Sequence, residues 1–266
     1  AVGNITQLAD TSGLNTHKTI KYWYDDLHRL IAAKSSRAAA GANYIQNYEY
    51  NAIGDITYKS DSGRYHYDGD QGSSFANPHA VTSITGGSTP TTYTYDQNGN
   101  VTSGDAQTFV WDYNNRISSI TPDGIIPHPI NYGYDSSGMR VSVADGSSIT
   151  VYPSKFYNTD GAMAQKHIFA GDLLTATIRG SGGAASLSAV HSDHLGSTVA
   201  VSDSNGGLAE ITDYFPFGSI RHSAVPSGSL EQRKFIGQEY DVATKLSYLE
   251  ARYYDGMRGR FLSQDA

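Results

Sequence analysis

The feature that most constrains the fold is a short motif that recurs six times along the chain. It consists of an aromatic residue, any residue, a second aromatic residue, and then Asp or Asn; the copies lie at 22–25, 48–51, 65–68, 93–96, 109–112 and 132–135. In a β-strand, residues i and i+2 project from the same face, so the two aromatic side chains can pack against those of the next copy. The acidic or amide side chain begins a turn, because it accepts hydrogen bonds from backbone N–H groups just ahead of it. Each copy is therefore predicted to form one β-hairpin, with Gly99 and Gly138 closing turns in the left-handed conformation.

Composition supports an all-β fold. The chain has 20 Tyr and 28 Gly among 266 residues, and only 17% of its residues are charged. Tyr favours the pleated surface of a sheet, and Gly supplies the positive φ that tight hairpin turns require. The copies are 16 to 28 residues apart, which is too irregular for a solenoid of identical rungs. We therefore expect antiparallel hairpins in a continuous spiralling sheet with loops of varying length.

Three further segments carry local predictions. Residues 31–42 lack the apolar stripe of a helix and are expected to form a continued strand and then a surface loop. Pro122, Pro127 and Pro129 are expected to mark a loop, because proline cannot donate to a sheet ladder. A connector is expected at residues 180–185, after which the aromatic motif stops.

Charge and hydropathy exclude two classes of partner. The formal net charge is −7, and the 19 Lys and Arg are scattered, so no basic stripe is present to neutralise a phosphate backbone. No apolar run approaches the roughly 20 residues that cross a bilayer, and no N-terminal signal segment is present. The chain begins inside an apparent repeat without an initiator Met, so we expect a piece of a longer polypeptide with any export signal upstream. The absence of Cys leaves the redox compartment open.

The second part of the chain carries a different set of ordered blocks. They read HSDHLGST at 191–198, DYFPFG at 213–218, FIGQEYD at 235–241, ARYYD at 251–255 and GRFLSQD at 259–265. The aromatic motif resembles the YD repeat of bacterial Rhs proteins, toxin-complex cocoon subunits and teneurins. The blocks, in this order, are similar to the Rhs repeat-associated core. The resemblance implies a YD-repeat region at 1–180 and an Rhs-associated core at 181–266.

The resemblance implies a structural function rather than an enzymatic one. It predicts a shell fragment of a secreted or cell-surface bacterial protein, in which the sheet encloses or presents a C-terminal effector and the core caps one end. The partners would be the rest of the same polypeptide and that effector. Three positions depart from the family pattern, because Gly256, Gln264 and Ala266 stand where Pro is common.

Arg252, Asp255 and Asp265 match positions that, by resemblance, lie in a self-processing region. Aspartyl-type cleavage needs two carboxyl groups close enough to share a proton, with their pKa values pushed apart. The structural alternative is that Asp255 forms another turn while Arg252 pairs with a nearby carboxylate. The chain ends one residue past Asp265, so we expect it to be catalytically silent as given.

Other candidate sites have simpler interpretations. His191 and Asp193 would share a strand face, but His194 would point to the opposite face, so a metal site is less favoured than a turn before Gly196. No cofactor is predicted. Pairs of acidic residues are expected by chance among the 26 that the chain contains, so they do not by themselves indicate a glycosidase.

A different class of function also fits the sequence. Stacked hairpins with tyrosine-rich edges could assemble into an extracellular fibre or adhesin. Exposed tyrosines in such a fibre could bind a glycan or a receptor. Concentration-dependent polymers would favour this alternative over an isolated shell fragment.

Overall fold

The computed structural model describes residues 2–11, 18–36, 43–68, 77–87, 89–124, 128–180, 185–225 and 231–265. The chain divides into two compact units, Ala1–Tyr93 and Thr94–Ala266. All named strands pair in antiparallel fashion, which confirms the predicted all-β fold. In the described part of the chain, no helix is both long and apolar enough to cross a membrane.

The first unit contains one eight-stranded sheet in which each strand pairs with its neighbours in sequence. The strands are β1 (Gln7–Asp10), β2 (Lys18–Tyr24), β3 (Leu30–Ser36), β4 (Ile45–Tyr50), β5 (Ile56–Lys59), β6 (Gly63–His66), β7 (Ser83–Thr85) and β8 (Thr91–Thr92). The continued strand expected after residue 31 is confirmed by β3, whereas residues 37–42 lie outside the described ranges.

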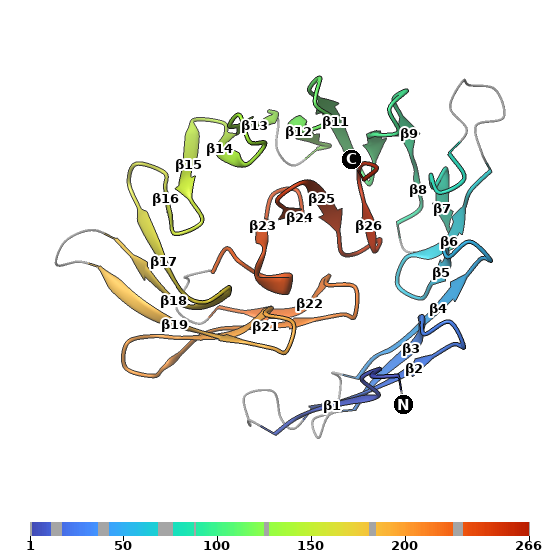
Figure 1. Cartoon of the computed structure of the whole chain (residues 1–266), viewed down its shortest axis with the longest axis horizontal. Coiled ribbons are helices and arrows are strands. Elements are labelled where there is room, and N and C mark those ends of the chain that lie inside the picture. Colours follow the sequence, from blue (N-terminus) through green and yellow to red (C-terminus); the bar gives the residue numbers. More distant parts are fainter. Residues whose placement is uncertain are drawn as a thin grey trace. The chain divides into compact units, whose positions relative to one another are not determined.

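The second unit contains a fourteen-stranded sheet, again with sequential neighbours paired. Its strands are β9 (Thr94–Tyr95), β10 (Val101–Gly104), β11 (Gln107–Trp111), β12 (Ile117–Pro122), β13 (Ile130–Tyr134), β14 (Arg140–Asp145), β15 (Ser148–Ser154), β16 (Tyr157–Thr159), β17 (Ala164–Ala170), β18 (Leu173–Arg179), β19 (Ser186–Ser192), β20 (Thr198–Ser202), β21 (Leu208–Tyr214) and β22 (Ile220–Ala224). The chain then forms the 3-10 turn η2 (Phe235–Gly237) and a four-stranded sheet of β23 (Glu239–Asp241), β24 (Leu246–Leu249), β25 (Arg252–Asp255) and β26 (Arg260–Phe261). Within this unit, the large sheet curves around the small one (Figure 1).

The motif's Asp builds the same turn wherever that turn is described. At Asp96, the backbone N–H donates to the carbonyl of Asn100 (2.9 Å), and Oδ1 accepts from the N–H groups of Asn98 and Asn100 (both 2.9 Å). The same two side-chain bonds occur at Asp25, Asn51, Asp112 and Asp135. Gly99 and Gly138 have φ of 81° and 89°, as predicted. The turn after residue 68 lies outside the described residues.

Successive hairpins are joined by the second aromatic residue of each motif. Tyr50 donates its hydroxyl to the carbonyl of Leu30 in the preceding hairpin (2.7 Å), and Tyr134 donates to Ile117 in the same way (2.8 Å). Trp111 makes the equivalent bond from its indole N–H (2.7 Å). At the second aromatic, the strand register shifts by one residue, a β-bulge that increases the local twist. Each hairpin is therefore fixed to its predecessor by a directional bond as well as by the sheet ladder.

The turn does not stop where the aromatic motif stops. Asp193 accepts from the N–H groups of Leu195 and Ser197 (2.9 and 2.8 Å), and Asp203 accepts from Asn205 and Gly207 (both 2.8 Å). The expectation that the repeat ends near residue 185 is therefore wrong for the backbone, although it describes the aromatic pattern. Tyr214 again donates to a carbonyl of the preceding hairpin, that of Thr198 (2.8 Å).

Pro122 is a second correction. The sequence predicts a loop at this position, but Pro122 is the last residue of β12 and pairs with Gln107 of β11. A proline at the end of a strand removes only one terminal donor, and Asp123 donates its N–H to Ala106 in the next position (2.7 Å). Pro127 lies outside the described residues.

Candidate functional site

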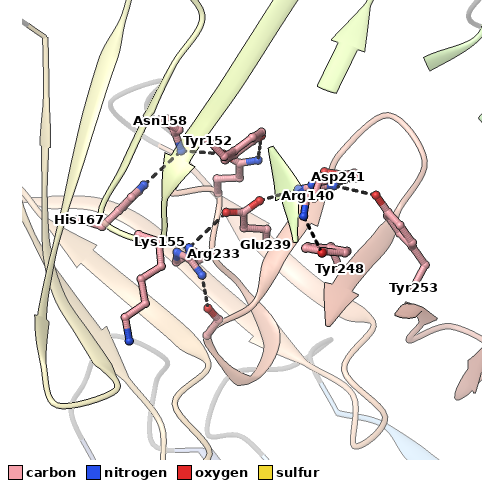
Figure 2. Close-up of polar contacts among 12 residues, drawn as sticks. Arg140, Tyr152, Lys155, Asn158, His167, Arg233, Glu239, Asp241, Tyr248 and Tyr253 are labelled. Carbon is pink, nitrogen blue, oxygen red and sulfur yellow. Dashed lines mark hydrogen bonds and ion pairs between the residues drawn. The ribbon is translucent and has the colours of Figure 1, made fainter. Parts of the chain in front are cut away.

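A buried polar seam joins the C-terminal segment to the inner side of the large sheet (Figure 2). At its centre is Arg140, the first residue of β14, whose side chain is fully buried. Its guanidinium donates to Glu239 (2.5 Å) and to Asp241 (2.7 Å), both on β23. A buried guanidinium with two carboxylate partners is costly to break, because either side would be left uncompensated. The pairs therefore fasten β23 to the large sheet.

Tyrosines surround the same guanidinium. The Arg140 side chain lies 4.6 Å from the ring centroid of Tyr248 and 5.2 Å from that of Tyr152, and it also lies over Tyr132 and Tyr253. The hydroxyl of Tyr253 accepts a bond from the guanidinium (3.1 Å). Burial raises the pKa of Tyr152 to about 12, so this phenol is neutral at physiological pH. The ring faces offer electron density to the cation, which favours the charged form of the arginine in a dry environment.

A second cluster anchors residues 231–234 to the large sheet. Glu210 of β21 binds the ammonium of Lys234 and accepts the backbone N–H of Glu231 (2.7 Å). Glu231 in turn accepts the hydroxyl of Thr177 (2.7 Å). Burial lowers the pKa of Lys234, although Glu210 opposes that shift. This segment is therefore held by ionic contacts to strands far from it in sequence.

His167 extends this cluster toward β16. Its Nε2 lies 3.2 Å from the amide nitrogen of Asn158, and its Nδ1 lies 3.3 Å from the hydroxyl of Thr177. Asn158 also approaches Gln232, which donates to the hydroxyl of Tyr152 (2.8 Å). Burial lowers the pKa of His167, so the neutral imidazole is favoured.

The predicted self-processing residues fall into two separate groups of contacts. Arg252 pairs with Asp265 (3.3 Å) and lies 3.8 Å from the ring centroid of Phe261. The Asp265 side chain is 81% exposed, whereas Arg252 is 23% exposed. An ion pair with one such exposed partner is worth at most about 1 kcal/mol.

Asp255 has different neighbours. Its Oδ1 accepts the backbone N–H groups of Met257 (2.8 Å) and Arg258 (3.1 Å), which forms a turn like those of the hairpins. Arg258 also donates from Nε to Asp105 (2.9 Å), a residue of the β10–β11 turn. Burial raises the pKa of Asp255 to about 6, and the charge of Asp105 adds to that shift. The sequence did not indicate Asp105, because it is 150 residues away and has no motif around it.

The histidine cluster forms a turn, as the sequence favoured. Asp193 is used by the backbone, and His191 contacts the hydroxyl of Ser202 through Nε2 (2.9 Å). Within the described ranges, no group of three or more His, Asp or Glu is placed to hold a metal ion.

Hairpins linked in series, with an inner face that binds a C-terminal segment through buried ion pairs, define a β-shell of the hairpin-repeat class. Comparisons with known proteins agree. Residues 184–266 match the family model of the teneurin YD-shell. The chain is 28% identical over 227 residues to the tRNA nuclease WapA of Bacillus subtilis (strain 168), which covers 76% of this chain and 9% of that protein. It is 25% identical over 298 residues to the toxin subunit YenC1 of Yersinia entomophaga, which covers 92% of this chain and 30% of that protein.

The solved structures show the same fold. The crystal structure of TcdB2-TccC3-Cdc42 covers 94% of this chain and 17% of the matched chain, with a TM-score of 0.54 and 17% sequence identity. The resemblance to the Rhs/YD-repeat family that the sequence indicated is thereby confirmed. The chain spans less than a third of the length of each of the two relatives above.

Proposed function

We propose that the chain is a structural shell fragment of a secreted or cell-surface Rhs-type toxin protein, where it encloses or presents a C-terminal effector. The observation that carries this proposal is the Arg140 seam, which fixes residues 231–262 against the inner side of a curved sheet. A segment held in this way can close a sheet or keep a downstream polypeptide in place. WapA is named as a tRNA nuclease and YenC1 as a toxin subunit, which supports a toxin as the parent protein. We also propose that a YD-repeat region at 1–180 is followed by a core at 181–266.

A protection experiment tests the proposal. The chain is expressed within its native full-length polypeptide, and a protease is added under conditions that leave folded sheets intact. The segment downstream of the core should be protected in the parent and degraded faster in Arg140→Met, because the seam no longer holds the core. Lys155→Met is the matched control, since its ion pair with Asp172 is exposed (49% and 101% side-chain exposure) and distant in role. Equal degradation of the downstream segment in parent and Arg140→Met would contradict the proposal.

We further propose latent aspartyl-type self-processing that involves Asp255 and Asp265, with Arg252 in support. The raised pKa of Asp255 supports it as the protonated member, and the exposed Asp265 is the candidate base toward water. In a chain extended by its native downstream segment, cleavage is expected shortly after Asp265. Asn substitution of Asp255 or Asp265 should abolish it. Unchanged cleavage in both variants would leave these residues with structural roles.

A fibre or adhesin remains a second candidate function. In the fourteen-stranded sheet, β22 lies at the end of the strand order, and a terminal strand can pair with another chain. Exposed aromatic side chains such as Tyr113 (91% exposed) would then contact a glycan or receptor. Mass measured across a concentration series discriminates the two functions, because a fibre grows with concentration and a shell fragment does not.

A further inference from the structure

A cavity of about 510 Å³ lies in the second unit, between five consecutive strands, β13 to β17, and residues 231–243. Its volume falls within the range of small-molecule sites. Ile130, Val143, Met163 and Val242 supply apolar surface, and three tyrosines are also among the lining residues. The cavity can therefore accept an apolar stem as well as a polar group.

The charges around this cavity are unequal. Asp145, Asp160, Glu231 and Asp241 line it, whereas Lys234 is the basic residue among the lining side chains. Lys234 is already bound to Glu210, which does not line the cavity, so its charge is spent elsewhere. The cavity consequently favours a positive ligand.

Two of the four carboxylates are already compensated. Asp241 receives the guanidinium of Arg140 at 2.7 Å, and Glu231 lies 3.6 Å from Arg179. These pairs belong to the seam described above. They leave Asp145 and Asp160 to determine what the cavity attracts.

Asp145 and Asp160 sit on turns at the ends of β14 and β16. Asp145 contacts Nε2 of His128 (2.7 Å), which carries a charge only when protonated, and 43% of the Asp145 side chain is exposed. Asp160 accepts the N–H groups of Ala162 (2.9 Å) and Met163 (2.6 Å), and these bonds lower its pKa. Among the described residues, neither carboxylate has a lysine or arginine partner. Both are therefore available to a cation that enters from solvent.

An independent observation comes from the wall of the cavity. Asn158 is 2% exposed and lines the cavity, and its Oδ1 has no hydrogen-bond partner. A buried acceptor without a donor costs about 1–3 kcal/mol. A ligand that donates hydrogen bonds would relieve that cost, and ammonium and guanidinium groups are donors without acceptors.

We propose that this cavity binds an organic cation, an alkylammonium or guanidinium group carried on an apolar stem. The cation is held by Asp145 and Asp160, and the stem packs on the apolar wall. Two sources share this chemistry: the side chain of a lysine or arginine on a polypeptide, and a free amine. The inference does not depend on the proposed shell function, because it rests on the cavity of the chain alone.

Titration calorimetry on the purified chain at low salt tests the site with three probes. The probes are 1,4-diaminobutane, N-acetyl-lysine amide and the neutral 1-butanol. The test variants are Asp145→Asn and Asp160→Asn, which keep side-chain shape and remove one charge each. Asp172→Asn is the matched control, because its fully exposed carboxylate lines a different cavity. Circular dichroism and thermal melting verify that each variant is folded.

Both cations should bind the parent and 1-butanol should not. Each test variant should weaken cation binding by about fivefold, the equivalent of roughly 1 kcal/mol, and Asp172→Asn should not weaken it. Binding of diaminobutane alone identifies a free amine as the ligand source, and binding of both cations identifies a side chain on a polypeptide. The proposal is overturned if neither cation binds saturably, or if folded Asp145→Asn and Asp160→Asn bind the cations as tightly as the parent.

Discussion

Replacing Arg140 with Met should destabilise the second unit more than any other single loss of charge in the seam. Met has a similar length and no charge, so Glu239 and Asp241 would remain buried at the place of a missing guanidinium. Loss of one partner from a buried ion pair costs about 3–5 kcal/mol. Each lost contact with a tyrosine face adds roughly 0.5 kcal/mol or more. We expect a loss near 4 kcal/mol, or a fall in Tm on the order of 10 °C for a unit of this size.

Urea unfolding followed by tyrosine fluorescence and by circular dichroism measures this loss. Lys155→Met serves as control and should change the free energy of unfolding by less than about 1 kcal/mol, because its ion pair is exposed. Adding Asp241→Asn to Arg140→Met should recover part of the loss, since a neutral amide does not need a counter-charge. The double-mutant cycle isolates this coupling.

The pH dependence gives a second measurement of the same effect. In the parent, burial raises the pKa of Asp241 and Arg140 opposes the shift. Without the guanidinium, the folded-state pKa should rise further above the unfolded value. A carboxyl group of this kind stabilises the fold below its unfolded pKa and loses that contribution as pH rises through its folded pKa. The deficit of Arg140→Met should therefore shrink as the pH falls toward 4, and a deficit that is constant with pH would refute the reasoning.

Three other perturbations have defined outcomes. Burial lowers the pKa of His167, so its contribution to stability should be lost as pH falls below about 6.5; His167→Gln should flatten this loss between pH 7 and pH 5 in urea titrations. Burial raises the pKa of Asp255 to about 6, so the parent should lose up to about 3 kcal/mol as pH rises from 4 to 7, and Asp255→Asn should remove this slope, with an unchanged slope counting against a buried carboxyl. Gly138→Val should destabilise by about 1–2 kcal/mol because φ is 89°, whereas Ser136→Val at an exposed turn position should be nearly neutral in thermal melts; equal melting of the two would argue against strain.

The local part of the fold could be predicted from the sequence. An aromatic pair followed by Asp specifies a strand, a face and a turn within a few residues, so the hairpins and the positive φ of Gly99 and Gly138 could be derived directly. The same turn at Asp203 was missed because no aromatic pair precedes it. At His28 and Asn115, residues other than Gly take the left-handed position (φ 63° and 58°), so a search for Gly alone would also miss turns.

The inner seam could not be predicted, because it depends on how far the sheet curves. Arg140 meets Glu239 across 99 residues, and Asp105 meets Arg258 across 153. No local pattern encodes such a pairing, which results from register, twist and bulges accumulated over many strands. The proposed dyad shows the same limitation, since Asp255 is influenced by Asp105 rather than by a carboxylate nearby in sequence.

One departure from the family pattern has a local reason in the structure. A Cβ atom on Gly256 would lie 2.8 Å from the backbone nitrogen of Ser219 and 2.9 Å from the carbonyl carbon of Gly218. The turn at 215–219 therefore approaches the backbone where a side chain would otherwise stand. Tyr254 strengthens this approach by donating its hydroxyl to the carbonyl of Phe217 (2.9 Å).

The bond from each second aromatic residue to the preceding hairpin makes the sheet modular in an evolutionary sense. Tyr50 and Tyr134 contact only the hairpin before them through this bond, so a duplication that copies one whole hairpin also copies its link. A gain or loss of one unit then preserves the link at every other junction, as in repeat proteins whose stability is a sum of nearest-neighbour terms. A partial insertion, by contrast, separates the aromatic donor from its carbonyl. Length variation should therefore occur in whole hairpins, and the interval between turns can drift as long as each junction keeps its donor.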